Sequence, residues 1–492
     1  MKYEVVIIGS GLGGLECAHI LSRAGMSVLL LERGAQAGGC IQSYKRRGLT
    51  FDTGFHYVGG LDEEQSLHAV FNHLGLLNLP WQRLDADFDR VTIGDRTFAF
   101  AQGYDEFVNT LAADFPAERV ALHRYADMLK RVDEQQFDAL NPQNGEGYSF
   151  SSGLFETSAY GYLAETFRDP LLINVLSGTS LKMELRRESL PLFTFAHGNS
   201  SFIESSWRLK GDGSLIVNSL AEDIRSRGGE IICNAEVQEL VEKNGKLAYA
   251  VCSNGESYEG DTFISDIHPA VTCGLVKQSD RMKKIYRHRM ERLENTFGMF
   301  TVSLCIKPNT LKYFNWNQYI YKEPDVWTFY QEDGPVKGVL VSCRVPEDGS
   351  EYVRQIDLLT PMTWSKCEQW NHTTVNHRGN EYKAMKERMT DECIILAERF
   401  IPGLGDMITG RYSSTPLTYR DYTCTPQGSA YGLRKDFGDP VMTLLSPRTP
   451  IPNLLLTGQN LMLHGLHGVT MTALFTCAEI LGKEQIWNIV KN

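Results

Sequence analysis

The first thirty residues alternate between apolar runs and a glycine-rich turn. Residues 4–8, EVVII, and 27–32, SVLLLE, are short apolar runs typical of buried strands. Between them, residues 15–22 place apolar side chains at helical spacing. This pattern predicts strand, tight turn, helix and strand, the beginning of a Rossmann-type α/β unit.

The turn itself reads GSGLGG over residues 9–14 and matches G-x-G-x-x-G. Gly9 permits the turn, Gly11 lets the backbone approach a pyrophosphate, and Gly14 lets helix and strand pack closely. The N-terminus of the following helix offers free N–H donors to phosphates. In this context the motif predicts a dinucleotide-binding site.

The residues after the second strand specify the cofactor further. Glu32 ends that strand, where a carboxylate can bond a ribose hydroxyl, and an acid there favours an unphosphorylated adenosine ribose despite the neighbouring Arg33. A glycine doublet, Gly38-Gly39, follows closely. An extended FAD needs backbone contact beyond its pyrophosphate, whereas a nicotinamide dehydrogenase does not. The doublet therefore favours FAD, and because Cys40 has no second cysteine close by, disulfide reductase chemistry is excluded.

The middle of the chain alternates between two kinds of pattern. Residues 75–195 read as helices with connecting loops, whereas 210–265 read as a helix followed by strands, with Asn244-Gly245 and Asn254-Gly255 as type I′ hairpin turns. Strand-like runs and one long helical pattern fill residues 281–414.

The stretch NLLLTGQNLMLHGLHG, residues 453–468, admits three interpretations. A membrane span is disfavoured because polar residues interrupt it. A metal site at His464 and His467 is disfavoured because no third ligand lies nearby in the sequence. An apolar strand, a glycine turn at Gly458 and a helix toward the C-terminus fit a close approach to a flat ligand, and we favour this third interpretation.

These motifs resemble the FAD-containing amine oxidase and phytoene desaturase superfamily. The segments FDTGFHYVGG (51–60), TPLTYRDYTCTPQGSAYGL (415–433) and SPRTPIPNLLLTGQN are similar to the branch that contains retinol saturase. The resemblance is dense over residues 1–60, 205–270 and 410–482 and thin elsewhere. One departure is Gln459, where an acid commonly contacts the ribityl chain; an amide can make a similar bond.

The resemblance implies a Rossmann-type FAD-binding domain interleaved with an α+β substrate domain. The expected boundaries are 1–75, 195–280 and 415–492 for the FAD domain, and 76–194 and 281–414 for the substrate domain. The expected cofactor-binding residues are Gly9, Gly11, Gly13, Gly14, Glu32, Arg33, Gly38, Gly39, Val237, Gly458, Gln459, Gly468 and Val469.

The resemblance also implies hydride transfer between the flavin and a carbon-carbon double bond of an apolar polyene or isoprenoid. Since the flavin carries the hydride, the protein must orient the substrate, exclude water and supply a proton. Motif position makes His56, Tyr431 and His464 the candidate catalytic residues, with Tyr57 and His467 as further candidates lining the flavin.

Composition narrows the remaining classes of protein and the expected cellular location. The 492 residues carry a net charge of -11, which argues against a nucleic-acid-binding protein. Eleven cysteines without a C-x-x-C pair fit reduced thiols, and no signal peptide precedes the first strand. We therefore expect a cytoplasmic protein. The basic amphipathic stretch RMKKIYRHRMERL, residues 281–293, adds a hypothesis of peripheral contact with anionic lipid.

Several alternatives stay open at this point. A carotenoid desaturase, a carotenoid isomerase that uses reduced flavin, and a flavin amine oxidase share these motifs, and a redox-silent binding protein is a non-enzymatic alternative. NAD(P)H is a candidate electron donor, but the chain holds one G-x-G-x-x-G, which FAD occupies in this interpretation. The exact substrate and the oligomeric state are beyond the sequence.

Overall fold

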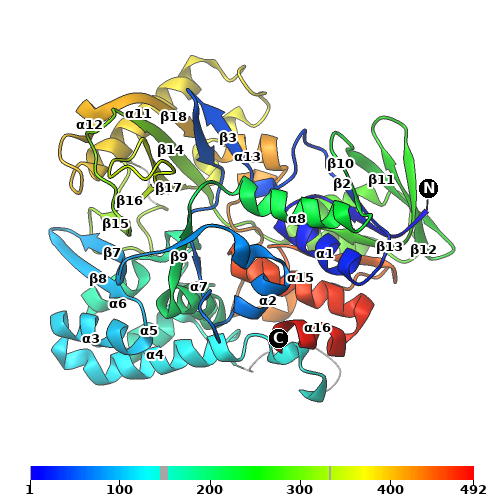
Figure 1. The fold of residues 1–492 in the computed structure, drawn as a ribbon, viewed down its shortest axis with the longest axis horizontal. Helices are drawn as coiled ribbons and strands as arrows, with labels where there is room; N and C mark the ends of the chain where they lie inside the picture. The colour runs from blue at the N-terminus through cyan, green and yellow to red at the C-terminus, as the bar shows by residue number, and fades with distance from the viewer. Residues whose placement is uncertain (1, 145–152, 332–333, 492) are drawn as a thin grey trace.

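Two β-sheets organise the protein. The computed structural model describes residues 2–144, 153–331 and 334–491, and these ranges contain two seven-stranded sheets. The first, with the N-terminal strand, lies at the right of Figure 1 and the second at the upper left. Helices surround both sheets. The mixed α/β class expected from the sequence is confirmed.

The first sheet has a parallel core in the order β10-β2-β1-β13, and β19 also pairs with β13. Its strands are β1 (Lys2–Ile8), β2 (Val28–Leu31), β10 (Glu230–Ile232), β11 (Val237–Lys243), β12 (Lys246–Cys252), β13 (Ser257–Ser265) and β19 (Leu454–Leu456). β1 is almost wholly buried, as expected for a strand covered on both faces. All seven strands fall within the three segments predicted to bind FAD, although the exact domain boundaries stay a prediction.

The two hairpin turns of this sheet differ from each other. Asn244 and Gly245 have φ values of 53° and 78°, as a type I′ turn requires, so the prediction is confirmed there. At the second turn Gly255 has a positive φ but Asn254 does not, and the type I′ prediction is wrong. The side chain of Asn254 instead accepts a hydrogen bond from the Glu256 N–H, which forms an Asx turn.

The second sheet has the order β18-β14-β17-β16-β15-β7-β8. Its strands are β7 (Asp87–Ile93), β8 (Arg96–Ala101), β14 (Gly298–Ile306), β15 (Asn317–Tyr321), β16 (Gly338–Cys343), β17 (Gln355–Met362) and β18 (Ile408–Ser414). The expectation of helices and loops alone over 75–195 is wrong, because β7 and β8 form a hairpin that pairs with β15. The alternation of apolar Val91 and Ile93 on one strand and of Phe98 and Phe100 on the other was the missed signal.

Short strands connect the two sheets. β3 (Ser43–Arg46) pairs with β4 (Leu49–Asp52), and β5 (Val58–Gly59), β9 (Ser206–Leu209) and β6 (Trp81–Arg83) form a three-stranded sheet.

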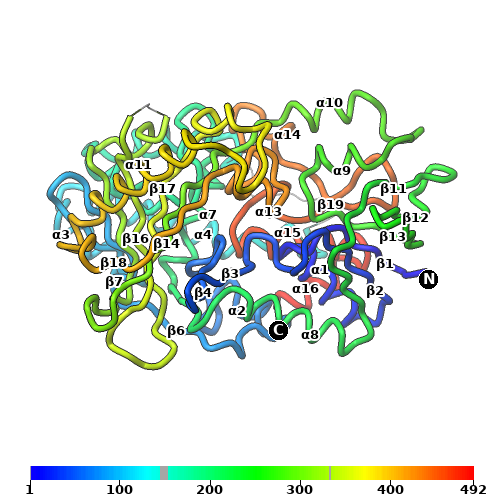
Figure 2. Tube along the Cα trace, turned by 90° about the horizontal axis from the view of Figure 1, so that it is seen from above, coloured from blue at the N-terminus to red at the C-terminus, as the bar shows by residue number. Residues whose placement is uncertain are grey.

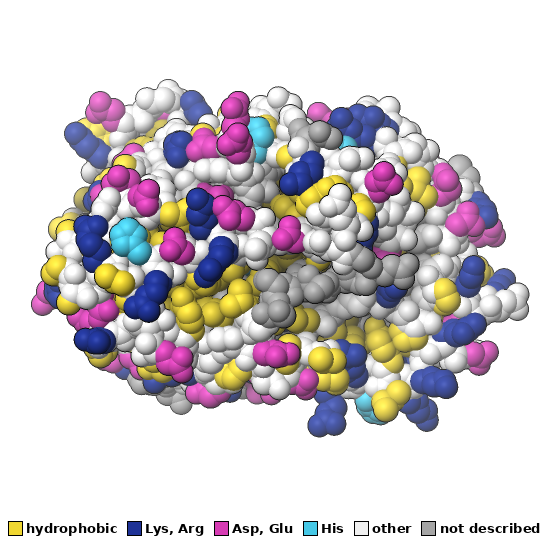
Figure 3. Space-filling view, turned by 90° about the horizontal axis from the view of Figure 1, so that it is seen from below, with side chains coloured by type: hydrophobic (Ala, Val, Ile, Leu, Met, Phe, Trp, Pro, Cys, Tyr) yellow, Lys and Arg dark blue, Asp and Glu magenta, His cyan; other side chains and the backbone are white. Residues whose placement is uncertain are grey.

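Helices cover the sheets and form most of the lower part of the molecule (Figure 1). They are α1 (Leu12–Arg23), α2 (His68–His73), α3 (Tyr104–Asp114), α4 (Arg119–Glu134), α5 (Ala159–Thr166), α6 (Pro170–Ser177), α7 (Leu192–Glu204), α8 (Ser214–Ser226), α9 (Pro269–Leu275), α10 (Lys284–Arg292), α11 (Gly379–Ala397), α12 (Leu404–Met407), α13 (Pro416–Thr423), α14 (Pro440–Thr443), α15 (Gly465–Leu481) and α16 (Lys483–Lys491). Figure 2 shows α9 and α10 on the opposite side of the first sheet from α8. The face seen from below carries a band of hydrophobic side chains near its middle, with charged side chains scattered over the rest of the face (Figure 3). None of the helices in the described ranges combines the length and apolar character needed to cross a bilayer.

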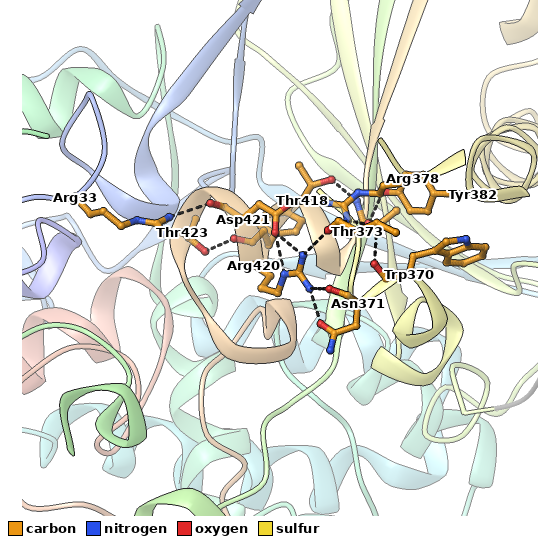
Figure 4. Close-up of polar contacts among 12 residues, drawn as sticks. Arg33, Trp370, Asn371, Thr373, Arg378, Tyr382, Thr418, Arg420, Asp421 and Thr423 are labelled. Atoms are coloured by element: carbon orange, nitrogen blue, oxygen red, sulfur yellow. Dashed lines mark hydrogen bonds and ion pairs between the residues drawn. The ribbon is translucent and has the colours of Figure 1, made fainter. Parts of the chain in front are cut away.

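A partly buried ionic network holds α13 between the two parts of the molecule (Figure 4). Asp421 on this helix accepts from Arg378 and from Arg420, the latter at 2.7 and 2.8 Å. On the other side, the Arg33 guanidinium donates to the Asp421 carbonyl oxygen at 2.9 Å. The Arg378 side chain is only 5% exposed, so its charge depends on this partner.

We expect Asp421→Ala to lower the free energy of unfolding by about 3 kcal/mol, because it leaves the buried Arg378 charge unpaired. Asp421→Asn, which keeps an acceptor, should cost less. A matched control is Lys130→Ala, which breaks an exposed ion pair with Glu134 on α4 and should cost less than about 0.5 kcal/mol. Urea unfolding of the three variants measures this, and equal losses for Asp421→Ala and Lys130→Ala would contradict the role of the network.

Candidate functional site

The carboxyl ends of the parallel strands meet at one edge of the first sheet. β1 ends at Ile8, β2 at Leu31, β13 at Ser265 and β19 at Leu456, and all are joined through parallel pairings. Ligands of open α/β sheets bind outside this edge. A cavity of about 480 Å³ begins here and extends toward the second sheet.

The turns that follow these strands pack so closely that several of their glycine positions have no space for a Cβ atom. A Cβ on Gly14 would lie 2.2 Å from the Gly9 carbonyl oxygen, which fits the predicted helix–strand packing role. A Cβ on Gly13 would lie 3.0 Å from the Gly458 Cα, so the β1–α1 and β19–α15 turns touch. Gly9 and Gly458 also have positive φ values, of 96° and 86°.

Asp266, the first residue after β13, lies beneath these turns. A Cβ on Gly11 would meet its Oδ2 at 2.5 Å, and one on Gly458 would meet its Oδ1 at 2.3 Å. Burial raises the pKa of this carboxyl to about 7, although the N–H groups of Gly14 and Gly11 lower it. The residue therefore exchanges its proton near neutral pH at the N-terminus of α1. Its role could not be foreseen from the motif alone.

Glu32 is held in place by the backbone around it. Its Oε2 accepts from the Ser10 N–H at 3.1 Å and the Ser10 hydroxyl at 2.5 Å, and its Oε1 accepts from the Gly34 N–H at 2.6 Å. A carboxylate offers about four acceptor positions, which leaves room for one further donor. The neighbouring Arg33 lines the cavity and also anchors α13 through Asp421.

The glycine doublet borders the same cavity. Gly38 donates its N–H to the Ser10 carbonyl oxygen at 2.9 Å, and a Cβ on Gly39 would lie 3.1 Å from the Gly11 Cα. Val237, at the beginning of β11, also lines the cavity. The doublet thus packs directly on the first glycine turn.

A buried lysine supports the C-terminal turn. Lys435 Nζ donates to the carbonyl oxygens of Thr443, Asn460 and Leu461 at 3.1, 2.8 and 3.1 Å. Burial lowers the pKa of this ammonium to about 7. These bonds hold the segment after Gly458 against the cavity, and the sequence offered no signal for this lysine.

The helix after this turn begins slightly earlier than its apolar pattern indicated. α15 begins at Gly465, with His464 before it. Val469 lines the cavity, whereas Gly468 does not: a Cβ there would meet the Leu463 Cβ at 2.6 Å, so this glycine serves close packing.

The candidate catalytic side chains lie along the same cavity but differ in their partners. Tyr431 donates its hydroxyl to the Leu181 carbonyl oxygen at 2.6 Å, and His464 Nε2 lies 3.0 Å from the Lys182 carbonyl oxygen. The rings of Tyr431 and His464 have centroids 4.7 Å apart. His56 Nε2 has no hydrogen-bond partner among the described residues.

Burial makes the cavity histidines neutral at pH 7. It lowers the pKa of His56 and of His464 to about 4. His467 faces His197, with ring centroids 4.6 Å apart, and burial lowers the pKa of His467 well below its usual range and that of His197 to about 3. These four rings offer neutral hydrogen-bonding groups rather than positive charge.

The second sheet supplies an apolar wall. Tyr319, Leu340 and Leu359 lie directly opposite one another across β15, β16 and β17, and all three line the cavity. Met299 of β14 adds to the same wall. This part of the cavity suits an apolar molecule.

One cationic side chain stands beside that wall. Lys182, at the end of a short 3-10 helix (Ser180–Lys182), lines the cavity and places Nζ 3.5 Å from the Tyr57 hydroxyl. It also lies 4.1 Å from the Phe202 ring centroid. No described carboxylate forms an ion pair with it, and burial lowers the pKa of the ammonium to about 8, although Asp89 raises it.

The cavity brings together most residues expected from the sequence. Those that line it are Gly9, Gly11, Gly13, Glu32, Arg33, Gly38, Gly39, His56, Tyr57, Val237, Tyr431, Gly458, Gln459, His464, His467 and Val469. Gly14 and Gly468 pack behind it. Sequence reasoning missed Asp266, Lys182 and the α13 residues Tyr419, Tyr422 and Thr423, which also line it. Only their closeness in space marks these residues.

Comparison with known proteins gives a consistent family. The model of the family described as flavin containing amine oxidoreductase matches residues 12–342. The chain is 24% identical to the all-trans-retinol 13,14-reductase of Homo sapiens, over 100% of this chain and 87% of the human protein. It is also 24% identical to a chloroplastic prolycopene isomerase of Daucus carota, over 88% of this chain and 72% of the carrot protein.

Solved structures share the fold at lower identity. An oxidoreductase from Methanosarcina mazei aligns with a TM-score of 0.62 at 16% identity, over 96% of this chain and 99% of that one. Putrescine oxidase bound to putrescine aligns with a TM-score of 0.63 at 13% identity, over the whole of both chains. A RAB GDI from Plasmodium falciparum aligns at 0.53 and 13%, over 98% of both chains. The family match, the strand-end cavity and the glycine turns lead to one conclusion: the chain belongs to the flavin-containing amine oxidoreductase family and is an FAD-dependent oxidoreductase.

Proposed function

We propose that this enzyme transfers hydride between FAD and a carbon-carbon double bond of an apolar polyene or isoprenoid, in the direction of reduction. The observation that carries the proposal is the apolar wall of Tyr319, Leu340 and Leu359 at the far end of the glycine-lined cavity. The relatives named all-trans-retinol 13,14-reductase, which match the chain over its full length, support this substrate class.

The residues present fit FAD. Gly9, Gly11 and Gly13 line the cavity at the N-terminus of α1, where a pyrophosphate would bind, and Glu32 keeps an acceptor position for a ribose hydroxyl. Gly38, Gly39 and Val237 would border the adenosine side, whereas Gly458, Gln459 and Val469 would border the ribityl chain and the ring. A raised pKa lets Asp266 be neutral beside the phosphates, which avoids repulsion. When bound, the flavin supplies hydride chemistry.

The protein's own residues would then orient the substrate, exclude water and supply a proton. The apolar wall positions a polyene, and α13 covers the cavity through Tyr419, Tyr422 and Thr423. The three catalytic candidates from the sequence lie along the cavity. Tyr431 and His464 are within hydrogen-bonding distance of backbone carbonyl groups, and His56 Nε2 has no hydrogen-bond partner among the described residues. Their catalytic roles are proposals.

An amine oxidase is the alternative of different chemistry. A protonated amine substrate would approach the Lys182 ammonium in a water-poor cavity, where like charges repel strongly. A carotenoid isomerase or desaturase would use the same apolar wall, and the similarity to prolycopene isomerase favours the isomerase as second candidate. An isomerase differs in consuming no net electrons.

The glycine cradle predicts how the protein retains its flavin. Gly11→Ala would place a methyl group 2.5 Å from Asp266 Oδ2, so we expect FAD affinity to fall at least about tenfold, on the scale of one lost pyrophosphate contact. Gly274→Ala on α9, with nothing within 4 Å of the added methyl group, is the matched control. Flavin titration of both apoproteins, with circular dichroism to verify folding, measures the difference. Equal affinities would contradict the placement of the pyrophosphate.

Substrate class and direction are tested by one anaerobic experiment. The enzyme-bound flavin is reduced with light and mixed separately with all-trans-retinol and a carotenoid, oxidised enzyme is mixed with putrescine, and the flavin spectrum is followed in each case. We expect reoxidation and a saturated product with a polyene and no reaction with putrescine. Isomerised polyene without reoxidation would establish the isomerase instead, and oxidised flavin reduced by putrescine would establish the amine oxidase. Adding NADH or NADPH to the oxidised enzyme tests the proposed nicotinamide electron donor.

We also propose contact with an anionic bilayer through the patch around α10. Met282 and Met290 of the predicted amphipathic stretch are buried, which leaves Ile285, 80% exposed, as its outward apolar side chain. Arg289 bonds the Val441 carbonyl oxygen, so the 79% exposed Val441 lies beside this helix. The exposed basic residues of the patch are Arg281, Lys283, Lys284 and Arg292. A positive patch on a chain of net charge -11 is complementary to anionic lipid.

Sedimentation with vesicles tests this patch. We expect binding to phosphatidylserine-containing vesicles that weakens with salt, and a loss of at least about tenfold when Lys283, Lys284 and Arg292 become glutamine, since each basic residue contributes about 1 kcal/mol. Vesicles of phosphatidylcholine alone are the control. Unchanged sedimentation of the glutamine variant would remove the proposal.

A further inference from the structure

Lys182 occupies an unusual position for a charged side chain. It lies beside the apolar wall of the cavity, between Tyr57 and Phe202, and its nearest polar contact is the Tyr57 hydroxyl at 3.5 Å. Burying an ammonium group in an apolar chamber costs free energy unless it is paired, so a lysine at this position indicates a functional role. None of the motifs identified in the sequence includes this position.

The partners of Tyr57 orient the lysine. The Tyr57 hydroxyl donates to Asp89 Oδ2 at 3.0 Å, and its oxygen lies 2.8 Å from the Tyr319 hydroxyl. A hydroxyl has one proton to donate, so the Tyr57 oxygen can accept from Lys182. One N–H of the ammonium is used in this way, and its other two are free to face the cavity.

The charges around this group come from several elements. Asp89 on β7 attracts the ammonium through Tyr57, while Asn317 on β15 donates to Asp89 Oδ1 at 2.8 Å and itself accepts from Arg208 on β9 at 2.7 Å. Tyr319 adds a neutral hydroxyl, and His464 contacts the lysine only through the backbone carbonyl. Asp89 therefore keeps the lysine protonated without forming a direct ion pair that would block its protons.

The other candidates lack an available acidic proton at neutral pH. His56 and His464 are neutral because burial lowers their pKa values to about 4, and the Tyr431 hydroxyl is engaged with Leu181. Arg33 lines the cavity near Glu32, where it anchors α13. Among the described residues that line the apolar end, Lys182 alone combines a positive charge with a pKa, about 8, suited to a general acid.

We propose that Lys182 is the general acid that protonates the substrate double bond, with Tyr57 and Asp89 as positioning residues. This inference rests on the proposed reduction. The π bond of the alkene breaks: one carbon would receive the hydride that a bound reduced flavin supplies, which leaves that flavin oxidised, and the other carbon receives a proton from Lys182 Nζ. Two C–H bonds form, Lys182 becomes a neutral amine, and solvent restores its proton after product release.

The experiment is a single turnover of photoreduced enzyme with all-trans-retinol, followed anaerobically from pH 6 to 10. The wild-type rate should be constant below about pH 8 and fall about tenfold per unit above it, because the acid must be protonated. Lys182→Met should be at least about 100-fold slower at pH 7 and lose this pH dependence. Lys182→Arg should be equally slow, because arginine keeps the charge but does not release a proton.

Controls separate catalysis from structure. Lys130→Met, on the surface of α4, should match the wild type. Retinol affinity of the oxidised Lys182→Met enzyme should stay within about threefold, which is about 0.65 kcal/mol. In a readout independent of turnover, ¹³C-labelled lysine in the oxidised holoenzyme should show one resonance that titrates near pH 8 and is missing from Lys182→Met.

The outcomes distinguish this inference from the proposed function. If wild type reduces retinol but Lys182→Met retains its rate within about threefold, Lys182 is not the acid. If the rate of retinol reduction fell 100-fold in His56→Ala or Tyr431→Phe while the decrease in rate above pH 8 stayed unchanged, that residue would be the proton donor instead. If no polyene reoxidises the wild-type flavin, the proposed reduction fails and this inference fails with it.

Discussion

The close approach of three backbone turns at one sheet edge is the constraint on which the rest of the structure depends. Gly11, Gly13 and Gly458 surround the Asp266 carboxylate so tightly that a Cβ on any of them would lie within 2.8 Å of a carboxylate oxygen. These turns follow β1, β19 and β13, strands separated by more than 180 residues of chain. Because these glycines carry no side chains, the turns close around Asp266, and the N-terminus of α1 borders the cavity in which a phosphate-containing ligand would bind.

The second part of the cavity follows a different principle. Its wall is a row of residues facing one another across neighbouring antiparallel strands, such as Leu340 opposite Leu359. Side chains at such paired positions form a continuous apolar surface. The ionic network of Asp421 and Arg378 holds α13 at the junction between the glycine turns and the apolar wall. A single cavity therefore combines both kinds of lining.

The fold by itself does not select the chemistry. Putrescine oxidase and a RAB GDI share the architecture at 13% identity, although the first is an oxidase bound to putrescine and the second is a RAB GDI. Function depends on the few polar groups in the chamber. Here these include neutral histidines, tyrosine hydroxyls and one lysine, and the charge of the lysine is what separates a polyene site from an amine site in our proposal.

The sequence by itself determined the cofactor half of the protein. The turn at 9–14, the acid Glu32, the doublet at 38–39 and the turn at Gly458 are short-range patterns, because each follows a strand directly and is read from local spacing. The β7–β8 hairpin was missed although its alternating apolar residues are visible in the sequence, whereas its pairing with β15, more than 200 residues away, is not. Only the tertiary structure placed Lys182 beside Tyr57 and Asp266 beneath the glycines, because contacts between distant segments carry no local signature. The pKa values that decide which group can hold a proton arise from burial, which the folded chain alone creates.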